Sequence, residues 1–218
     1  MAPRLHTPRR EDIPEVDRDA YDQVIGRQRT HRGDLRDVEP EAHIELGPYH
    51  AALATSPPMG LLLSQLGKVS RTRGEFAGSY SHAQRELVDQ VLCYDYGWNG
   101  FLISHTLDGL SAGMRMELIE ALRTGDMSLM NDEERLLVTY IRQVIAGTVT
   151  DATWAAVEQL LTTRGAVEYT VFILFLNVVV RMFQAFGAPE VSDQQVTELL
   201  EGIKSGTVAL PDFKERIN

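Results

Sequence analysis

The stretch Arg85–Gly113, RELVDQVLCYDYGWNGFLISHTLDGLSAG, decides the fold of this chain. Its larger side chains recur at helical spacing in two groups, the first made of Leu87, Val88, Val91 and Leu92, and the second of Trp98, Phe101, Leu102 and His105. A short Asp95-Tyr96-Gly97 turn separates the two groups. The stretch therefore predicts a helical hairpin.

Glu86 and His105 are placed symmetrically in this hairpin. Each lies about nine residues from the turn, which corresponds to roughly 13 Å along its own helix. In an antiparallel pair of helices the two residues then stand at the same height. We expect their side chains to face each other.

Length and charge limit the class of protein. The 218 residues suit one domain, and no stretch has the composition of a linker between two cores. The net charge of −10 argues against nucleic acid as a partner. The start has no apolar segment of a signal peptide, and the apolar run Val171–Val180 is half a membrane span. We expect a soluble, cytoplasmic protein that does not bind a membrane.

Capping residues and breakers predict about eight to ten helices and no strand. We expect helices over Val16–Arg29, Gly47–Ala54, Pro57–Arg71, the hairpin, Arg115–Leu122, Asp132–Ala146, Thr150–Leu161, Val167–Phe186 and Ser192–Lys204. Gly165 is expected to separate the helix that ends at Leu161 from the apolar helix Val167–Phe186. Val167–Phe186 is apolar on nearly all sides, which predicts a helix buried all round or an oligomer interface.

The order of these elements resembles the carboxymuconolactone decarboxylase and alkylhydroperoxidase D superfamily. The resemblance rests on Ile13–Asp22, on Arg85-Glu86-Leu87 with His105, and on Gly147–Trp154 followed by Val167–Pro189. It implies an all-α bundle of the alkylhydroperoxidase D-like type that forms dimers, trimers or hexamers. It also implies an N-terminal extension over residues 1–46, a helical domain over residues 47–204 and a tail over residues 205–218.

The peroxidase branch of the superfamily has two redox cysteines between its Glu and its His. Here those positions hold Trp98 and Phe101. A dithiol peroxidase needs one thiolate for attack and a second for resolution, and Cys93 is the single cysteine of the chain. A family label of peroxiredoxin activity would therefore lack chemical support. The decarboxylase branch also lacks the cysteines; Tyr96-Gly97-Trp98 resembles its Tyr-x-Trp group but lies earlier than the family's spacing.

The resemblance implies a decarboxylase-like lyase or an isomerase that acts on a small organic acid, lactone or enolisable ring compound without cofactor or metal. Glu86 would act as general base or acid, with a pKa that burial raises toward neutrality, and His105 would polarise a carbonyl or carry a second proton. Further residues expected to contact the substrate are Tyr96, Trp98, Phe101, His82, Asn177 and Arg181.

Each candidate also has a structural interpretation. Glu86 could pair with Arg85 of another subunit, His105 could be a hydrogen-bonded core residue, and His82 is expected on a solvated surface. Cys93 is expected to be a small buried side chain. Asn177 needs a buried hydrogen-bond partner and Arg181 a carboxylate.

Other function classes remain open. One is a peroxidase-like antioxidant protein, and another is a ligand-binding scaffold without catalysis. A metal enzyme is the third, although His43, His50, His82 and His105 lack the spacing at which one element holds a metal.

Overall fold

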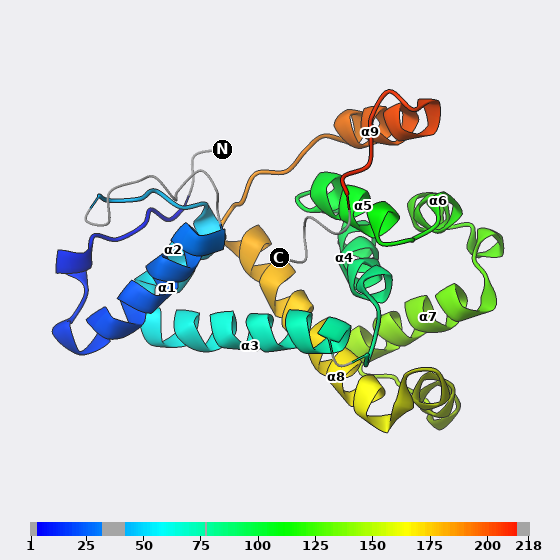
Figure 1. Ribbon diagram of the computed structural model, residues 1–218, viewed down its shortest axis with the longest axis horizontal. Coiled ribbons are helices and arrows are strands. Elements are labelled where there is room, and N and C mark those ends of the chain that lie inside the picture. Colours follow the sequence, from blue (N-terminus) through cyan, green and yellow to red (C-terminus); the bar gives the residue numbers. More distant parts are fainter. Residues whose placement is uncertain (1–3, 32–41, 77, 213–218) are drawn as a thin grey trace. The chain divides into compact units, whose positions relative to one another are not determined.

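The computed structural model of the chain describes residues 4–31, 42–76 and 78–212, and within these ranges every regular element is a helix. The α-helices are α1 (Arg18–His31), α2 (Pro48–Thr55), α3 (Pro57–Phe76), α4 (His82–Tyr96), α5 (Leu102–Ser111), α6 (Met116–Thr124), α7 (Asp132–Ala146), α8 (Asp151–Ala185) and α9 (Asp193–Ser205). Short 3-10 turns lie at Arg10–Asp12, Glu15–Asp17 and Met127–Leu129. The all-α class is confirmed (Figure 1). The polar segment expected to be an arm lies largely outside the described residues.

The chain divides into two compact units. One comprises residues 1–69 and 181–188, and the other comprises residues 70–180 and 189–218. Neither boundary coincides with the expected ones at residues 46 and 204, because α3 and α8 each run from one unit into the other. In the first unit, the rings of Tyr49 and Phe183 stack with centroids 4.6 Å apart. The second unit contains the hairpin and both of its candidate catalytic residues.

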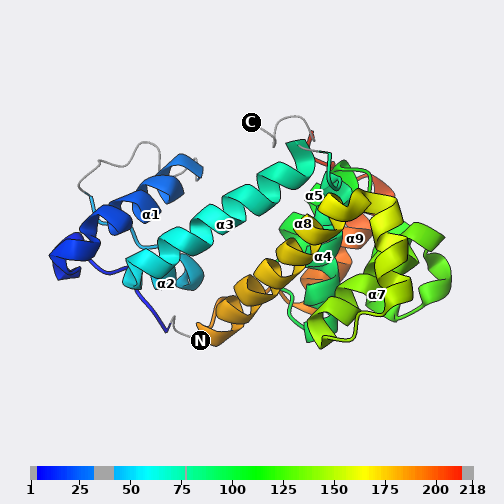
Figure 2. The same cartoon turned by 90° about the horizontal axis from the view of Figure 1, so that it is seen from below.

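The predicted hairpin is formed by α4 and α5. A capping box starts α4, where the Ser81 hydroxyl accepts from the Gln84 N–H and the Gln84 side chain accepts from the Ser81 N–H. Gly97 ends α4 in the left-handed region, with φ 57°, which glycine adopts without steric cost. α5 packs against α4, with Thr106 opposite Gln90 and His105 opposite Glu86, so the two helices run antiparallel; both are labelled in Figures 1 and 2.

α4 is the central helix of the second unit. It contacts α5, α6 and α7, and its residues from Glu86 to Cys93 are all buried. α8 is tied to its start, because the Tyr169 hydroxyl donates a hydrogen bond of 2.8 Å to the carbonyl oxygen of Gln84. Polar side chains that α4 turns toward its neighbours are therefore withdrawn from water.

The break before the apolar segment lies at Thr162, and the expectation that Gly165 forms it is wrong. Thr162 has φ 67° and ψ 164°, a region that is almost exclusive to glycine. Gly165 lies within the helix after the break. A Cβ there would be 2.7 Å from the carbonyl oxygen of Ser79, so this glycine allows two segments to approach closely.

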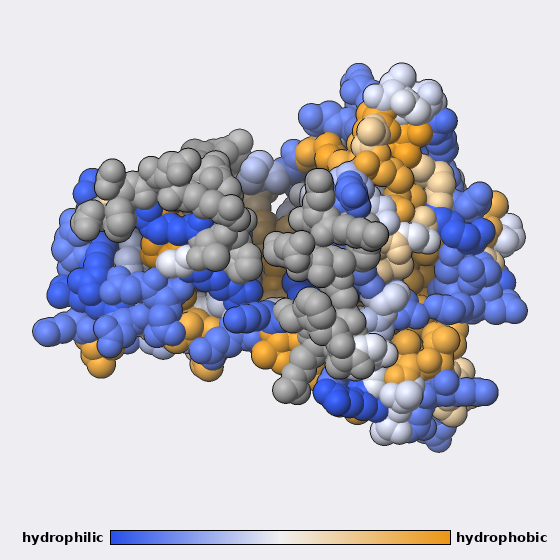
Figure 3. All heavy atoms as spheres, viewed as in Figure 1, coloured by the Kyte–Doolittle hydropathy of each residue, from blue (hydrophilic) through white to orange (hydrophobic). Residues whose placement is uncertain are grey.

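The apolar part of α8 is not buried all round within one chain. Its residues Tyr169, Phe172, Ile173 and Leu176 are fully buried. A second stripe lies 42–50% exposed and consists of Val167, Val171, Leu174 and Val178. Apolar side chains also reach the surface among charged ones on the face shown in Figure 3. By length and composition alone α8 could cross a membrane, and 44% of its most apolar window is buried.

Candidate active site

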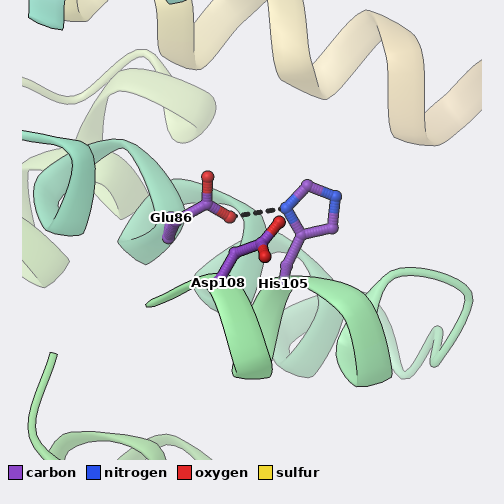
Figure 4. A group of neighbouring side chains, drawn as sticks. All are labelled: Glu86, His105 and Asp108. Atoms are coloured by element: carbon purple, nitrogen blue, oxygen red, sulfur yellow. Dashed lines mark hydrogen bonds and ion pairs between the residues drawn. The ribbon is translucent and has the colours of Figure 1, made fainter. Parts of the chain in front are cut away.

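Glu86 and His105 face each other across the hairpin, as their spacing predicts. Nδ1 of His105 lies 2.6 Å from Oε2 of Glu86, a hydrogen bond between α5 and α4 (Figure 4). The Glu86 side chain is 1% exposed, whereas that of His105 is 17% exposed. The other ring nitrogen points away from the Glu86 carboxylate (Figure 4). The pair thus joins a buried carboxylate to an imidazole that reaches solvent.

His82 belongs to the same buried group, and its expected place on a solvated surface is wrong. It is buried, and its Nε2 lies 3.0 Å from Oε1 of Glu86. Arg85 of the same chain, not of another subunit, contacts the same carboxylate oxygen, with Nη2 3.2 Å away. His82 and Arg85 therefore contact Oε1 of Glu86, whereas His105 bonds to Oε2.

The surroundings of Glu86 lower its pKa well below the ordinary value, which corrects the expected rise. Burial acts to raise the pKa, but the charge and hydrogen bond of His105 lower it more, and His82 and Arg85 add to this effect. Glu86 is therefore ionised at neutral pH. A carboxylate that holds its proton so weakly is a poor general base and cannot serve as a general acid.

His105 has the complementary shift. Burial lowers its pKa, but the carboxylates of Asp89 and Glu86 outweigh burial and raise the pKa above the ordinary value of 6.5. The two carboxylates therefore favour the protonated form of the imidazole. Of the two residues, His105 is the one that can deliver a proton to a bound molecule.

Sequence reasoning missed three charged residues of this group. Asp89 lies 3.4 Å from Nδ1 of His105, and Arg71 lies 3.7 Å from Asp89. Asp108 is beside His105 on α5 (Figure 4). Helical spacing could have identified two of them, because Asp89 follows Glu86 and Asp108 follows His105 by three residues. Arg71 is on α3, and no local pattern connects it with the hairpin.

Gly109 lets α5 approach α4 at this point. A Cβ added at Gly109 would be 3.3 Å from the Cβ of Glu86 and 2.4 Å from the sulfur of Met114. Both distances are shorter than ordinary carbon contacts in proteins. The small residue therefore helps to fix the separation of the two helices that carry Glu86 and His105.

Two of the expected substrate contacts lie next to His105. The ring of Phe101 is 5.1 Å from the imidazole, centroid to centroid, and Trp98 packs edge-on against Phe101 at 4.8 Å. Trp98 is buried and Phe101 is half-buried. The half-buried Phe101 ring therefore lies beside the imidazole, and the buried Trp98 ring supports it from behind.

The remaining three expected contacts have other partners. Tyr96 donates a hydrogen bond of 2.7 Å to Oδ1 of Asn177; both side chains are half-buried, so Asn177 has the expected hydrogen-bond partner but is not itself fully buried. Arg181 belongs to the other unit, where its Nη1 donates to the amide oxygen of Gln184. The structure therefore does not assign these three residues to the Glu86 and His105 site.

Comparisons with protein-family models, curated proteins and solved structures gave no match for this chain. The resemblance to the decarboxylase and alkylhydroperoxidase superfamily therefore stays a prediction. The geometry of the site is the basis for its chemistry.

A metal ion is one possible occupant. Glu86, His105 and Asp108 offer ligand atoms within 4.8 Å of one another (Figure 4). Two observations oppose this occupant. The ring nitrogen nearest the carboxylates already bonds to Glu86, and the Arg85 guanidinium lies 3.2 Å from the same carboxylate. A cation would meet repulsion from that guanidinium in a medium of low dielectric constant.

The cysteine is placed away from peroxide chemistry. Cys93 is fully buried, which confirms the expected packing role. Burial raises the pKa of its thiol and the charge of Asp89 adds to the rise, so the thiolate that attacks a peroxide is disfavoured. A cavity of about 320 Å³ adjoins Cys93 on the side of α9, but Glu86 and His105 do not line it.

Proposed function

We propose that this protein is an acid–base enzyme in which His105 transfers protons and Glu86 holds the imidazole in place. The substrate would be a small organic acid, lactone or enolisable ring compound, and the reaction a decarboxylation or an isomerisation without cofactor. The observation that carries the proposal is the 2.6 Å hydrogen bond between a carboxylate that is 1% exposed and an imidazole that is 17% exposed.

The hydrogen bond at Nδ1 supports a defined role for each residue. It directs the Nδ1 proton to Glu86 and leaves Nε2 as the nitrogen at which a substrate could exchange a proton. In the decarboxylation of a β-keto acid, the bond between the carboxyl carbon and the α-carbon breaks. Its electron pair forms the carbon–carbon double bond of the enol, while the π electron pair of the keto group moves to the keto oxygen, which takes the Nε2 proton; the substrate carboxylate leaves as carbon dioxide. Isomerisation of an enolisable ketone needs the same proton donor.

The charges of the pair support this order of events. An imidazolium next to a buried carboxylate is held in one orientation, so a developing enolate oxygen meets a donor that is already in place. The half-buried Phe101 ring would favour a planar, apolar substrate body beside the imidazole. The raised pKa of His105 favours the protonated form that can act as the donor.

A peroxidase-like antioxidant function is less well supported. It needs a reactive thiolate, and burial of Cys93 disfavours one. A ligand-binding scaffold without catalysis is the stronger alternative, since the cavity beside Cys93 has a lining that includes neither Glu86 nor His105. The exposed edge of His105 is the observation that favours catalysis over such a scaffold.

Proton exchange in D2O tests the proposal whichever of the two reactions the protein catalyses. Proton NMR would follow deuterium incorporation at the α-carbon of a panel of cyclic β-diketones, β-keto acids and unsaturated lactones, together with any release of carbon dioxide. We expect at least one class to exchange faster with the protein than in buffer. His105→Asn should lower that rate roughly 10²–10⁴-fold, and Glu86→Gln should lower it because the imidazole loses its anchor.

A surface pair of the same two residue types provides the control. His43 lies 3.6 Å from Glu45 in the first unit, where both side chains reach solvent. His43→Asn and Glu45→Gln should leave the exchange rate unchanged. Exchange that is equally fast in His105→Asn and in the unsubstituted protein would exclude the proposed role, provided that circular dichroism shows both to be folded.

A further inference from the structure

Asp89 is a fully buried carboxylate on α4. Its side chain is 0% exposed, and neither of its oxygens accepts a hydrogen bond from a described residue. Buried carboxylates are normally hydrogen-bonded or paired, because removal of a charge from water is unfavourable. The position of Asp89 therefore calls for a compensating charge nearby.

Two cations provide this compensation. Oδ2 of Asp89 lies 3.4 Å from Nδ1 of His105, and Oδ1 lies 3.7 Å from Nη2 of Arg71. Both distances exceed those of a good N–H···O hydrogen bond, so the attraction is mainly between charges. It is strongest with the imidazole, because the Arg71 side chain is 34% exposed and water screens its charge.

One nitrogen of His105 therefore faces two carboxylates. Glu86 and Asp89 lie about one turn apart on α4, and Nδ1 is 2.6 Å from the first and 3.4 Å from the second. A neutral imidazole would leave both buried carboxylates without this positive charge. Protonation of the ring adds a positive charge next to both carboxylates, beside those of Arg85 near Glu86 and Arg71 near Asp89.

We propose that Asp89 is a positioning residue: together with Glu86 it keeps His105 protonated and holds its ring against α4. Any effect on turnover rests on the proposed function of His105, whereas the effect on the charge of the imidazole does not. Asp89 itself would touch no substrate, because its side chain is fully buried.

The other charged and titratable groups around this pair belong to four helices. They are Arg71 on α3, His82, Arg85, Glu86 and Cys93 on α4, Asp108 on α5, and Tyr169 on α8. Glu86 acts on His105 in the same direction as Asp89, and Arg71 acts in the opposite direction. A substitution of Asp89 and one of Arg71 should therefore move the protonation of His105 in opposite directions.

Nitrogen-15 and carbon-13 NMR of the His105 ring, recorded from pH 5 to pH 10, tests the proposal. Asp89→Asn keeps the shape of the side chain and removes its charge. We expect the midpoint of the His105 titration to fall by at least about one pH unit, a tenfold loss of proton affinity. Asp95→Asn is the control, because Asp95 is on the same helix but pairs with Arg142 at 2.7 Å. In Asp95→Asn the midpoint of the His105 titration should stay at the value of the unsubstituted protein.

An unchanged midpoint in folded Asp89→Asn overturns the proposal. If that variant does not fold, Arg71→Gln decides, since its side chain reaches solvent and its removal leaves Asp89 in place. The midpoint of His105 should then rise, and a midpoint that stays or falls overturns the proposal. The measurement needs no substrate. If the proposed catalysis failed, the shift of the His105 midpoint in Asp89→Asn would still be observed, so the two failures can be told apart.

Discussion

Oε2 of Glu86 and Nδ1 of His105 lie 2.6 Å apart although 19 residues separate them along the chain. The contact crosses the hairpin of α4 and α5 at equal height on both helices. It couples a carboxylate of lowered pKa to an imidazole of raised pKa, so the two charges stabilise each other. Folding and proton binding are therefore linked at this site.

Stability should decline on the alkaline side. The folded pKa of His105 is raised above its ordinary value of 6.5, so its contribution is complete below 6.5 and is lost as the pH rises through the folded pKa. The folded pKa of Glu86 is lowered, so its contribution is complete above 4.5 and is lost as the pH falls through the folded pKa. Both contributions are present between these two values.

Thermal unfolding followed by circular dichroism between pH 5 and pH 10 measures this dependence. We expect the Tm to fall as the pH rises above 6.5, with each unit of raised pKa worth about 1.4 kcal/mol. In His105→Asn the decline above pH 6.5 should be weaker, because the titrating group is missing. A decline of equal size in both proteins would show that another group causes it.

Cys93→Ala should leave any activity in place. The thiol is fully buried and smaller than most core side chains, so its removal should lower the free energy of unfolding by roughly 1 kcal/mol or less. Thiol-dependent reduction of hydroperoxides should be negligible in both proteins. Peroxide turnover that disappears in Cys93→Ala would instead favour the peroxidase interpretation.

Metal binding at the site should be weak. The Arg85 guanidinium, 3.2 Å from the Glu86 carboxylate, opposes a second cation, and binding would displace the proton at Nδ1 of His105. Isothermal titration with Zn²⁺ or Mn²⁺ at neutral pH should detect no stoichiometric binding at micromolar concentration. One equivalent bound, and lost in Asp108→Asn, would contradict this expectation.

Gly165→Ala should destabilise the second unit. The new Cβ would be 2.7 Å from the Ser79 carbonyl oxygen and 3.0 Å from the Cβ of Leu161, and backbone must move to relieve the first contact. We expect a loss of roughly 1–3 kcal/mol in urea unfolding. Gly26→Ala in α1 is the control, because its Cβ meets nothing within 4 Å. There the better helix former should be neutral or stabilising by about 1 kcal/mol.

The exposed stripe Val167, Val171, Leu174 and Val178 should bind a second copy of the chain. Its spacing of four, three and four residues is that of a helix seam that packs on another helix. Light scattering should give more than the single-chain mass of about 24 kDa at micromolar concentration. Leu174→Glu should lower the measured mass, whereas Leu160→Glu, at an exposed position before the kink, should not.

The outcome also separates a protein partner from a lipid one. α8 is long and apolar enough for a membrane span, so vesicle flotation belongs beside the light scattering. The protein could instead be a monomer that floats with phosphatidylcholine vesicles and loses this property in Leu174→Glu. The partner of the stripe would then be a membrane surface and not a second copy of the chain. Monomers that do not float would leave the stripe without either partner.

The sequence alone determined the elements whose signals are local. Asn131 starts α7 directly before the predicted helix Asp132–Ala146, and Gly97 ends α4 within the predicted turn, because caps depend on residues within a few positions of one another. The facing of Glu86 and His105 was also predictable. Equal distances from one turn fix the relative height of two antiparallel residues.

The tertiary structure decided the charges of the site and the partners of its residues. Burial alone suggested a raised pKa for Glu86, but His82, Arg85 and His105 converge on it and reverse the direction. A pKa depends on which groups meet in space, and no periodicity records that. The break at Thr162 was likewise not predictable, because threonine rarely adopts a positive φ and no local pattern marks this position.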